Sequence, residues 1–216
     1  MKRIVFISGH YGSGKTNFAV NLALNFALDN KKVKLADLDI VNPYFRSKDS
    51  EKLLAESGIE LIVSDFANSN LDIPALPQKM YSIVDEKDCN FIVDVGGDER
   101  GALALGRISS QINENDYDMF LVVNFYRPLT STEKDVIQIK NEIENACGLK
   151  FTGIVNNSNL GAETTQEDIL STIPKIQNLS EQLKLPVVMT CVKEDLYNGL
   201  KDKIENIFPL KLQKLF

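Results

Sequence analysis

The stretch that decides the fold reads Ile4-Val5-Phe6-Ile7-Ser8-Gly9-His10-Tyr11-Gly12-Ser13-Gly14-Lys15-Thr16. From Gly9 onward it fits the pattern G-x-x-x-x-G-K-[ST] at every fixed position, directly after an apolar run and before a segment of helical period. The glycines allow the backbone to curl with its N–H groups facing inward, as an anion cradle that the N-terminus of the next helix extends. The stretch therefore predicts a strand, a phosphate loop (residues 9–16) and a helix, in that order.

The side chains of the phosphate loop have distinct expected ligands. We expect Lys15 to reach the β- and γ-phosphates of a nucleoside triphosphate and the Thr16 hydroxyl to complete a position on Mg²⁺. The alternative is a glycine-rich turn with an accidental Lys-Thr, which the flanking strand and helix argue against. The residues predicted to bind nucleotide here are Gly9, Gly12, Ser13, Gly14, Lys15, Thr16 and Asn17.

Short β-branched runs alternate with segments of helical period along the rest of the chain. The predicted strands are 3–8, 32–37, 59–63, 90–95, 119–124, 152–156 and 187–191, and the predicted helices include 15–29 and 131–146. Several strands are apolar at consecutive positions, as expected for parallel strands covered on both faces. The alternation predicts an α/β fold with a doubly wound, mostly parallel sheet, in one domain spanning residues 1–216, with its site at the carboxyl ends of the strands.

Carboxylates follow two of the predicted strands. Asp37 and Asp39 are separated by one residue at a strand end, so both point to the same side. We expect Asp37 in the shell of Mg²⁺, and Asp39, nearer the loop tip, to orient the water that attacks the γ-phosphorus. Solvated strand-end charges are the alternative. Asp94 ends another apolar strand before Gly96-Gly97; we expect Asp94 in the outer metal shell and the Gly97 amide on a γ-phosphate oxygen, where it would sense hydrolysis.

With these motifs in this order, the chain resembles the MinD/ParA/CobQ type of P-loop NTPase (SIMIBI class), in which the second strand carries D-x-D and an Asp-x-x-Gly follows a later strand. The resemblance extends from Gly9 to about Asn156. It implies catalytic roles for Lys15 and Asp39, metal positions at Thr16 and Asp94, and a place for Asn156 beside adenine. It also implies a monomer–dimer or partner switch driven by ATP.

Two positions of the phosphate loop depart from the family pattern. Many family members carry a second lysine directly after the first loop glycine, and it reaches across a dimer to the partner's nucleotide, whereas this chain has His10. A histidine is shorter and titrates near neutrality, so a nucleotide-sandwich dimer does not follow from the resemblance. The alternative is that His10 packs or hydrogen-bonds within the loop. Tyr11, where the family often has glycine, is the second departure.

The sequence favours adenine over guanine as the base. Guanine recognition usually requires an N/T-K-x-D loop after a strand, and the nearest string, residues 192–195, lacks the leading Asn or Thr and follows the last predicted strand. The strand that ends at Asn156 and Asn157 instead presents amides, which can donate to and accept from the adenine edge. Caps for the loop are the alternative role of these amides. The predicted ligands are ATP and Mg²⁺.

Composition and charge limit the partners and the other possible sites. The formal net charge of -6 gives no general attraction to nucleic acid or to anionic membranes. The three separated cysteines and the single histidine argue against a disulfide framework and a thiolate or histidine metal centre. The apolar run 4–7 is interrupted by Gly9 and is too short for a signal peptide or a membrane span. We expect the apolar stretch 207–216 to dock on the domain. We expect a cytoplasmic protein with no nucleic-acid partner and no stable membrane anchor.

Three functions remain open. The first is an ATPase switch whose nucleotide state controls an unidentified protein partner or a nucleotide-dependent homodimer. The second is an ATP-dependent small-molecule kinase or CobQ-like synthase, for which residues 68–78 are a candidate acceptor border. The third is a nucleotide-binding module without catalysis. Arg46, Arg100 and Arg107 lie in or after the expected switch segments; their alternatives are charge neutralisation at the phosphates, partner contact, or the commoner solvent-facing position.

Overall fold

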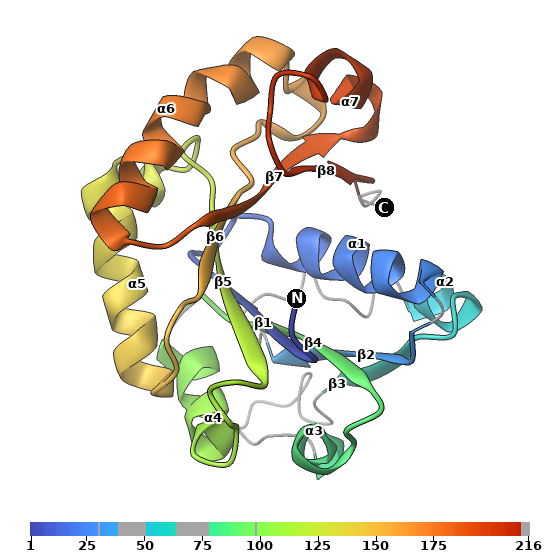
Figure 1. Cartoon of the computed structure of the whole chain (residues 1–216). Helices are drawn as coiled ribbons and strands as arrows, with labels where there is room; N and C mark the ends of the chain where they lie inside the picture. Colours follow the sequence, from blue (N-terminus) through green and yellow to red (C-terminus); the bar gives the residue numbers. More distant parts are fainter. Residues whose placement is uncertain (30, 39–50, 64–77, 98, 213–216) are drawn as a thin grey trace.

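The computed structural model describes residues 1–29, 31–38, 51–63, 78–97 and 99–212, which build one eight-stranded sheet (Figure 1). The strands are β1 (Ile4–Ser8), β2 (Val33–Leu38), β3 (Glu60–Val63), β4 (Asn90–Val95), β5 (Tyr117–Val123), β6 (Gly153–Asn156), β7 (Val187–Lys193) and β8 (Ile207–Leu210). Their order across the sheet is β3-β2-β4-β1-β5-β6-β7-β8, and all neighbours are parallel. The predicted α/β fold with a doubly wound, mostly parallel sheet is confirmed.

Helices cover both faces of the sheet. The α-helices are α1 (Lys15–Leu28), α2 (Glu51–Glu56), α3 (Ser82–Asp85), α4 (Glu99–Ser109), α5 (Glu133–Cys147), α6 (Gln166–Leu183) and α7 (Glu194–Leu200), with 3-10 turns η2 (Gln78–Tyr81), η3 (Pro128–Thr130) and η4 (Gly161–Glu163). One apolar core packs α1 and α2 against the sheet, and a second packs α3, α4, α5 and α6 against the other face. In the part of the chain that the structure describes, every helix is too short or too polar to span a bilayer.

The two predicted helices correspond to α1 and α5. Helix α5 begins two residues later than the pattern predicts, because the Thr132 side chain caps it by accepting a hydrogen bond from the Asp135 amide. It ends at Gly148, which has a φ of 75° and a backbone N–H bonded to the Glu144 carbonyl. The helix therefore ends in a left-handed glycine cap.

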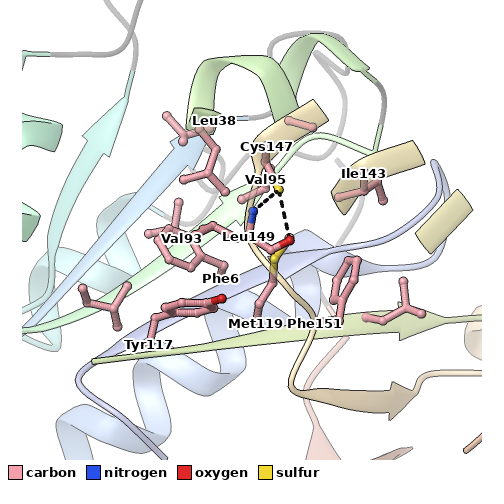
Figure 2. Close-up of a cluster of buried hydrophobic side chains, with 14 of the residues drawn as sticks. Phe6, Leu38, Val93, Val95, Tyr117, Met119, Ile143, Cys147, Leu149 and Phe151 are labelled. Carbon is pink, nitrogen blue, oxygen red and sulfur yellow. Dashed lines mark hydrogen bonds between the residues drawn. The ribbon is translucent and has the colours of Figure 1, made fainter. Parts of the chain in front are cut away.

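Figure 2 shows part of the core between the sheet and the end of α5. The rings of Phe6 and Tyr117 meet edge to face, with their centroids 5.9 Å apart. Beside them the Cys147 thiol lies 3.5 Å from the Leu149 amide nitrogen, which donates to it. Cys147, Cys89 and Cys191 are all buried and free, and each fills apolar space in the core.

Each predicted strand is present, but β8 was not predicted from the sequence. It is only four residues long and contains Pro209, which lacks a backbone N–H. The amide of Thr190 in β7 donates to the Asn206 carbonyl at 2.9 Å, so in the alternating pattern of a parallel pair Pro209 turns its nitrogen away from β7. Proline therefore breaks no hydrogen bond here, because β8 lies at the edge of the sheet.

The chain beyond β7 docks on α1. The ring of Phe208 meets that of Phe18 edge to face at 5.5 Å. The side-chain amide of Asn21 donates to the Lys211 carbonyl at 3.0 Å and accepts from the Lys211 amide at 2.9 Å, as a neighbouring strand would. The expected docking of the C-terminal stretch is thus observed for residues 207–212.

A buried carboxylate fixes the connection from α5 to β6. The Glu144 residue is only 6% exposed. Its partners are Lys140 Nζ at 2.9 Å, Lys150 Nζ at 2.8 Å and the Phe151 amide at 3.0 Å. Burial alone would raise the pKa of this carboxyl, but the hydrogen bonds from Lys150, Lys140 and Phe151 outweigh it, so the pKa of Glu144 lies below its ordinary value.

We predict that Glu144→Gln lowers the free energy of unfolding at neutral pH by about 1–3 kcal/mol, because charge-assisted hydrogen bonds are lost. A carboxyl whose pKa is depressed on folding stabilises the protein fully above its unfolded pKa, about 4.3, and loses that contribution as pH falls through the folded pKa. The parent should therefore lose stability more steeply than the variant from about pH 5 downward. Denaturant unfolding over this range measures both curves.

Glu142→Gln is the matched control, since Glu142 is exposed and, among the residues that the structure describes, is bonded only by Gln138 of the same helix. It should change the stability by less than about 0.5 kcal/mol. Parallel curves for the parent and Glu144→Gln below about pH 5 would contradict the assignment.

Candidate phosphate-binding site

The carboxyl ends of β1, β2 and β4 place the predicted site residues at one edge of the sheet. β4 lies between β1 and β2, with Asp94 opposite Ile7 in one pair and opposite Asp37 in the other. Residues at the same level of neighbouring parallel strands point to the same face. Ile92 and Leu35, two residues earlier, pack in the core under α1, so Asp94 and Asp37 face the side of the sheet that carries α1.

The phosphate loop has the curled backbone that the pattern predicts. Gly9, Gly12 and Gly14 have φ angles of 149°, 76° and 86°, which L-residues with side chains rarely adopt. A Cβ on Gly9 would lie 2.3 Å from the Val122 carbonyl oxygen, and one on Gly14 would lie 2.3 Å from Asn157 Nδ2. Glycine is therefore required here both by conformation and by the close approach of β5 and of the loop after β6.

Two donors of the phosphate loop converge on one acceptor. The His10 carbonyl oxygen accepts from the Ser13 amide at 3.1 Å and from Lys15 Nζ at 3.3 Å. Lys15 is only 5% exposed, so its ammonium is held inside the curl of the loop. A phosphate oxygen carries more negative charge than a carbonyl and is a stronger acceptor for both donors. The loop therefore brings an ammonium donor and an amide donor together on one acceptor.

The predicted metal residues lie together. Thr16 Oγ1 donates to Asp94 Oδ2 at 2.6 Å, which joins the start of α1 to the end of β4. Both residues are buried, and Asp37, also buried, is paired with Asp94 across β2 and β4. One hydroxyl and two carboxylates, contributed by three separate segments of sequence, thus gather on the α1 side of the sheet.

This donor set suits Mg²⁺ that is shared with a phosphate. Mg²⁺ prefers oxygen ligands, keeps several waters, and is usually held by one or two carboxylates together with substrate phosphates. Within the described ranges, no group of three or more His, Cys, Asp or Glu side chains has the spacing of a metal cage built by protein alone. Thr16, Asp37 and Asp94 fit a cation bound with a nucleotide.

The turn after β4 packs directly on the phosphate loop. A Cβ on Gly97 would lie 2.2 Å from the Gly9 carbonyl oxygen and 3.0 Å from the His10 carbonyl carbon and the Tyr11 nitrogen. The sequence singled out Gly97 for contact with the γ-phosphate. The structure brings its backbone against the start of the loop, where no larger residue fits without a shift of main chain.

Asn156 and Asn157, at the end of β6, point to opposite faces. Asn156 Nδ2 donates to Thr172 Oγ1 of α6 at 3.1 Å, whereas Asn157 Nδ2 donates to the Ser13 carbonyl at 2.7 Å. The adenine contact assigned to Asn156 remains a prediction; the residue that touches the phosphate loop is its neighbour. Residues two apart in a strand share a face, so Asn157 lies on the same face as Val155, which packs in the core on the α1 side. This alternation is the sequence signal that distinguishes Asn157 from Asn156.

His10 and Tyr11 lie on the outer part of the phosphate loop. His10 Nδ1 lies 2.9 Å from the Tyr11 carbonyl oxygen, so the alternative in which His10 hydrogen-bonds within the loop is observed. The Tyr11 side chain is 58% exposed. Neither side chain adds to the donors that converge on the His10 carbonyl.

The other residues singled out from the sequence either have no described contact with the phosphate loop or lie outside the described residues. Asp39, Arg46 and residues 68–77 lie outside the described residues. Arg100 and Arg107 fall in α4, and Arg107 is exposed in its last turn. The string 192–195 spans the end of β7 and the start of α7, where Lys193 Nζ donates to the Ala162 carbonyl at 2.9 Å.

Sequence reasoning missed two contacts to the carbonyl groups of the phosphate loop. One is the bond from Asn157 to Ser13. The other comes from Arg127, in the segment between β5 and α5, whose Nε donates to the Gly12 carbonyl at 2.9 Å. No periodicity or motif marks Arg127, since it is an exposed residue between two elements.

Comparison with solved structures shows the same fold in proteins of low sequence identity. FtsY from Thermotoga maritima is similar with a TM-score of 0.61 and 21% identity, covering 90% of this chain and 63% of that one. FtsY from Elizabethkingia anophelis in complex with GDP has a TM-score of 0.55 and 16% identity, covering 99% and 61%. FlhF complexed with GTP/Mg²⁺ has a TM-score of 0.55 and 17% identity, covering 87% and 64%. The chain thus spans less than two thirds of the length of these structures.

Sequence comparison gives the family. No curated protein matched the chain. A family model described as the CobQ/CobB/MinD/ParA nucleotide binding domain matches residues 4–182, which include β1, the phosphate loop, Asp37, Asp94 and the loop after β6. With the curled loop, the Thr16–Asp94 bond and the parallel sheet in place, we conclude that the chain belongs to the CobQ/CobB/MinD/ParA nucleotide-binding domain family.

Proposed function

We propose that this protein binds ATP with Mg²⁺, hydrolyses it, and acts as a nucleotide-controlled switch on a protein partner or on its own dimer. The observation that carries the proposal is the bond from Thr16 to Asp94, which couples the phosphate loop to the end of β4. Two residues of β4 and its turn then bear on the loop, Asp94 through this bond and Gly97 through backbone contact. Loss of a phosphate would therefore change the contacts of the turn that leads into α4.

Each site residue that the structure describes has a proposed part in nucleotide binding. The inward amides of the loop and Lys15 neutralise the phosphate chain, and Thr16 with the two aspartates of β2 and β4 provides the oxygen ligands of the cation. Mg²⁺, when bound with the nucleotide, supplies charge neutralisation at the phosphate oxygens. The Gly97 amide is proposed to donate to a γ-phosphate oxygen, so that loss of this phosphate releases the turn.

Two further roles extend the proposal beyond the described contacts. Asp39 is proposed to orient the attacking water, because it follows Asp37 by two residues at the carboxyl end of β2. Adenine is proposed as the base, since residues 156–159, at the end of β6 and directly after it, carry three asparagines and a serine, with no carboxylate to accept from the two ring N–H groups of guanine. The bound GDP and GTP named in two similar structures belong to proteins under 25% identical.

We predict that Lys15→Ala weakens the binding of Mg-ATP by about 10- to 100-fold, because the variant loses charge-assisted hydrogen bonds to phosphate. Isothermal titration calorimetry with ATP and GTP at millimolar Mg²⁺ measures both the loss and the choice of base. Lys201→Ala, an exposed lysine at the end of α7, is the matched control and should bind like the parent.

Uptake of neither nucleotide by the parent would refute the proposed function. Equal affinity of the parent and Lys15→Ala would refute the role of the loop, and tighter binding of GTP than ATP would overturn the choice of adenine.

We predict that Asp39→Ala binds Mg-ATP as well as the parent but hydrolyses it more slowly by a factor of about 100 or more, since a positioned carboxylate contributes this much to activation of water. Release of phosphate is the measurement. The variant loaded with ATP should also show an oligomeric state or partner binding that the ADP-bound parent does not.

Identical behaviour of the ATP and ADP forms in every binding measurement would refute the switch. An unchanged rate in Asp39→Ala would refute its water-orienting role. Release of ADP only when a metabolite is added would point instead to a kinase or CobQ-like synthase.

We predict that Gly97→Ala weakens Mg-ATP binding by about tenfold, because its Cβ forces main chain of the phosphate loop to move. Gly58→Ala is the control: Gly58 has a φ of 71° but nothing within 4 Å of a Cβ, so it should cost stability without reducing affinity. Calorimetry and denaturant unfolding separate the two effects. Parental affinity in Gly97→Ala would contradict the prediction.

A further inference from the structure

The side chain of Arg127 lies across the phosphate loop. Its Nε donates to the Gly12 carbonyl at 2.9 Å. Its Nε, Cδ and Cζ atoms lie 3.6–4.0 Å from the position that a Cβ on Gly12 would occupy. A guanidinium is thus held against the loop by a residue between β5 and α5, a segment where no site residue was predicted from the sequence.

The backbone around Arg127 is fixed by a buried asparagine. Asn124 is 1% exposed, and its carbonyl oxygen accepts from the Arg127 amide at 3.2 Å and from Thr130 Oγ1 at 2.6 Å. Its side-chain Oδ1 accepts from the amides of Tyr126 at 3.0 Å and Asn159 at 3.2 Å. The same side chain therefore holds the segment after β5, which carries Arg127, and the segment after β6, which carries Asn157.

Arg127 and Asn157 donate hydrogen bonds to two consecutive carbonyl groups of the phosphate loop, those of Gly12 and Ser13. In a trans peptide the C=O and the following N–H point in opposite directions. Holding the Gly12 carbonyl outward therefore turns the Ser13 N–H inward, and holding the Ser13 carbonyl outward turns the Gly14 N–H inward. The Ser13 amide does point back into the loop, where it donates to the His10 carbonyl at 3.1 Å.

The charge of Arg127 adds to this geometry. A guanidinium stays protonated at all ordinary pH values, and its hydrogen bonds are stronger than those of neutral donors. A hydrogen bond to the carbonyl of a peptide also polarises that peptide, which makes its N–H a better donor. Among the described residues, Nη1 and Nη2 of Arg127 have no hydrogen-bond or ion-pair partner, so the Gly12 carbonyl is the group that fixes the side chain.

We propose that Arg127 is a positioning residue for polyphosphate binding, which holds the Ser13 amide toward the phosphates through the Gly12 carbonyl and acts independently of the base. This inference rests on the proposed nucleotide binding. Because the contact is with the loop and not with a base, its effect is the same for any ligand that occupies the loop with a phosphate chain.

The test uses the full chain and three probes with Mg²⁺: ATP, GTP and inorganic tripolyphosphate, which has no base or ribose. Arg127→Ala should weaken each complex by about the same factor, roughly tenfold, which is the effect of one charge-assisted hydrogen bond. Arg127→Lys, which keeps a charged donor, should recover more of the affinity than Arg127→Gln, which keeps only a neutral one. Calorimetry measures all of these affinities.

Arg107→Ala is the matched control, because Arg107 is likewise an exposed arginine and lies in the last turn of α4. It should leave the three affinities unchanged. The denaturant midpoint of Arg127→Ala should equal that of the parent, which separates loop positioning from a general loss of structure. In hydrolysis, Arg127→Ala should raise KM more than it lowers kcat, since binding and not water activation is affected.

Three results would overturn the inference while the proposed function stands. They are unchanged affinities in Arg127→Ala, a loss confined to ATP and GTP with tripolyphosphate unaffected, and a parent that binds ATP but not tripolyphosphate. The second would assign Arg127 to the base or ribose. If the parent binds none of the three probes, the proposed function itself fails, and the inference falls with it.

Discussion

The phosphate loop is confined by main chain on two sides. The Val122 carbonyl of β5 closes on Gly9 from one side, and Gly97 after β4 closes on the Gly9 carbonyl from the other. Because β1 lies between β4 and β5, both contacts follow directly from the strand order. The curl of the loop, the inward direction of its donors and the reach of Thr16 to Asp94 all depend on this confinement.

Polar groups from more distant segments complete the support of the loop. Asn124 joins the segments after β5 and β6, and from these segments Arg127 and Asn157 reach the outward carbonyls of the loop. A buried polar network of this kind stabilises one arrangement only when its members find partners, and Asn124 has partners for both ends of its amide. The family pattern specifies the inner side of the loop, whereas this network supports the outer side.

The sequence predicted what local pattern and parallel topology determine. The glycine and lysine spacing gave the loop, consecutive apolar residues gave the central strands, and strand-end carboxylates gave the meeting of Asp37 and Asp94. It missed what depends on tertiary contact. β8 is short and carries a proline that only an edge position tolerates, Asn157 differs from Asn156 by the parity of one strand position, and an exposed Arg127 has no periodic signal. Asp39 lies outside the described residues, so its role rests on sequence alone.

Pro209 has a consequence for the protein in concentrated solution. A free outer strand with all its amides available is a template on which another chain can add and extend the sheet. On β8 the position of Pro209 faces away from β7 and offers no N–H to such a chain. The residue therefore interrupts the hydrogen-bond ladder at this border of the sheet, and it disfavours aggregation by strand addition there without weakening the pairing of β8 with β7.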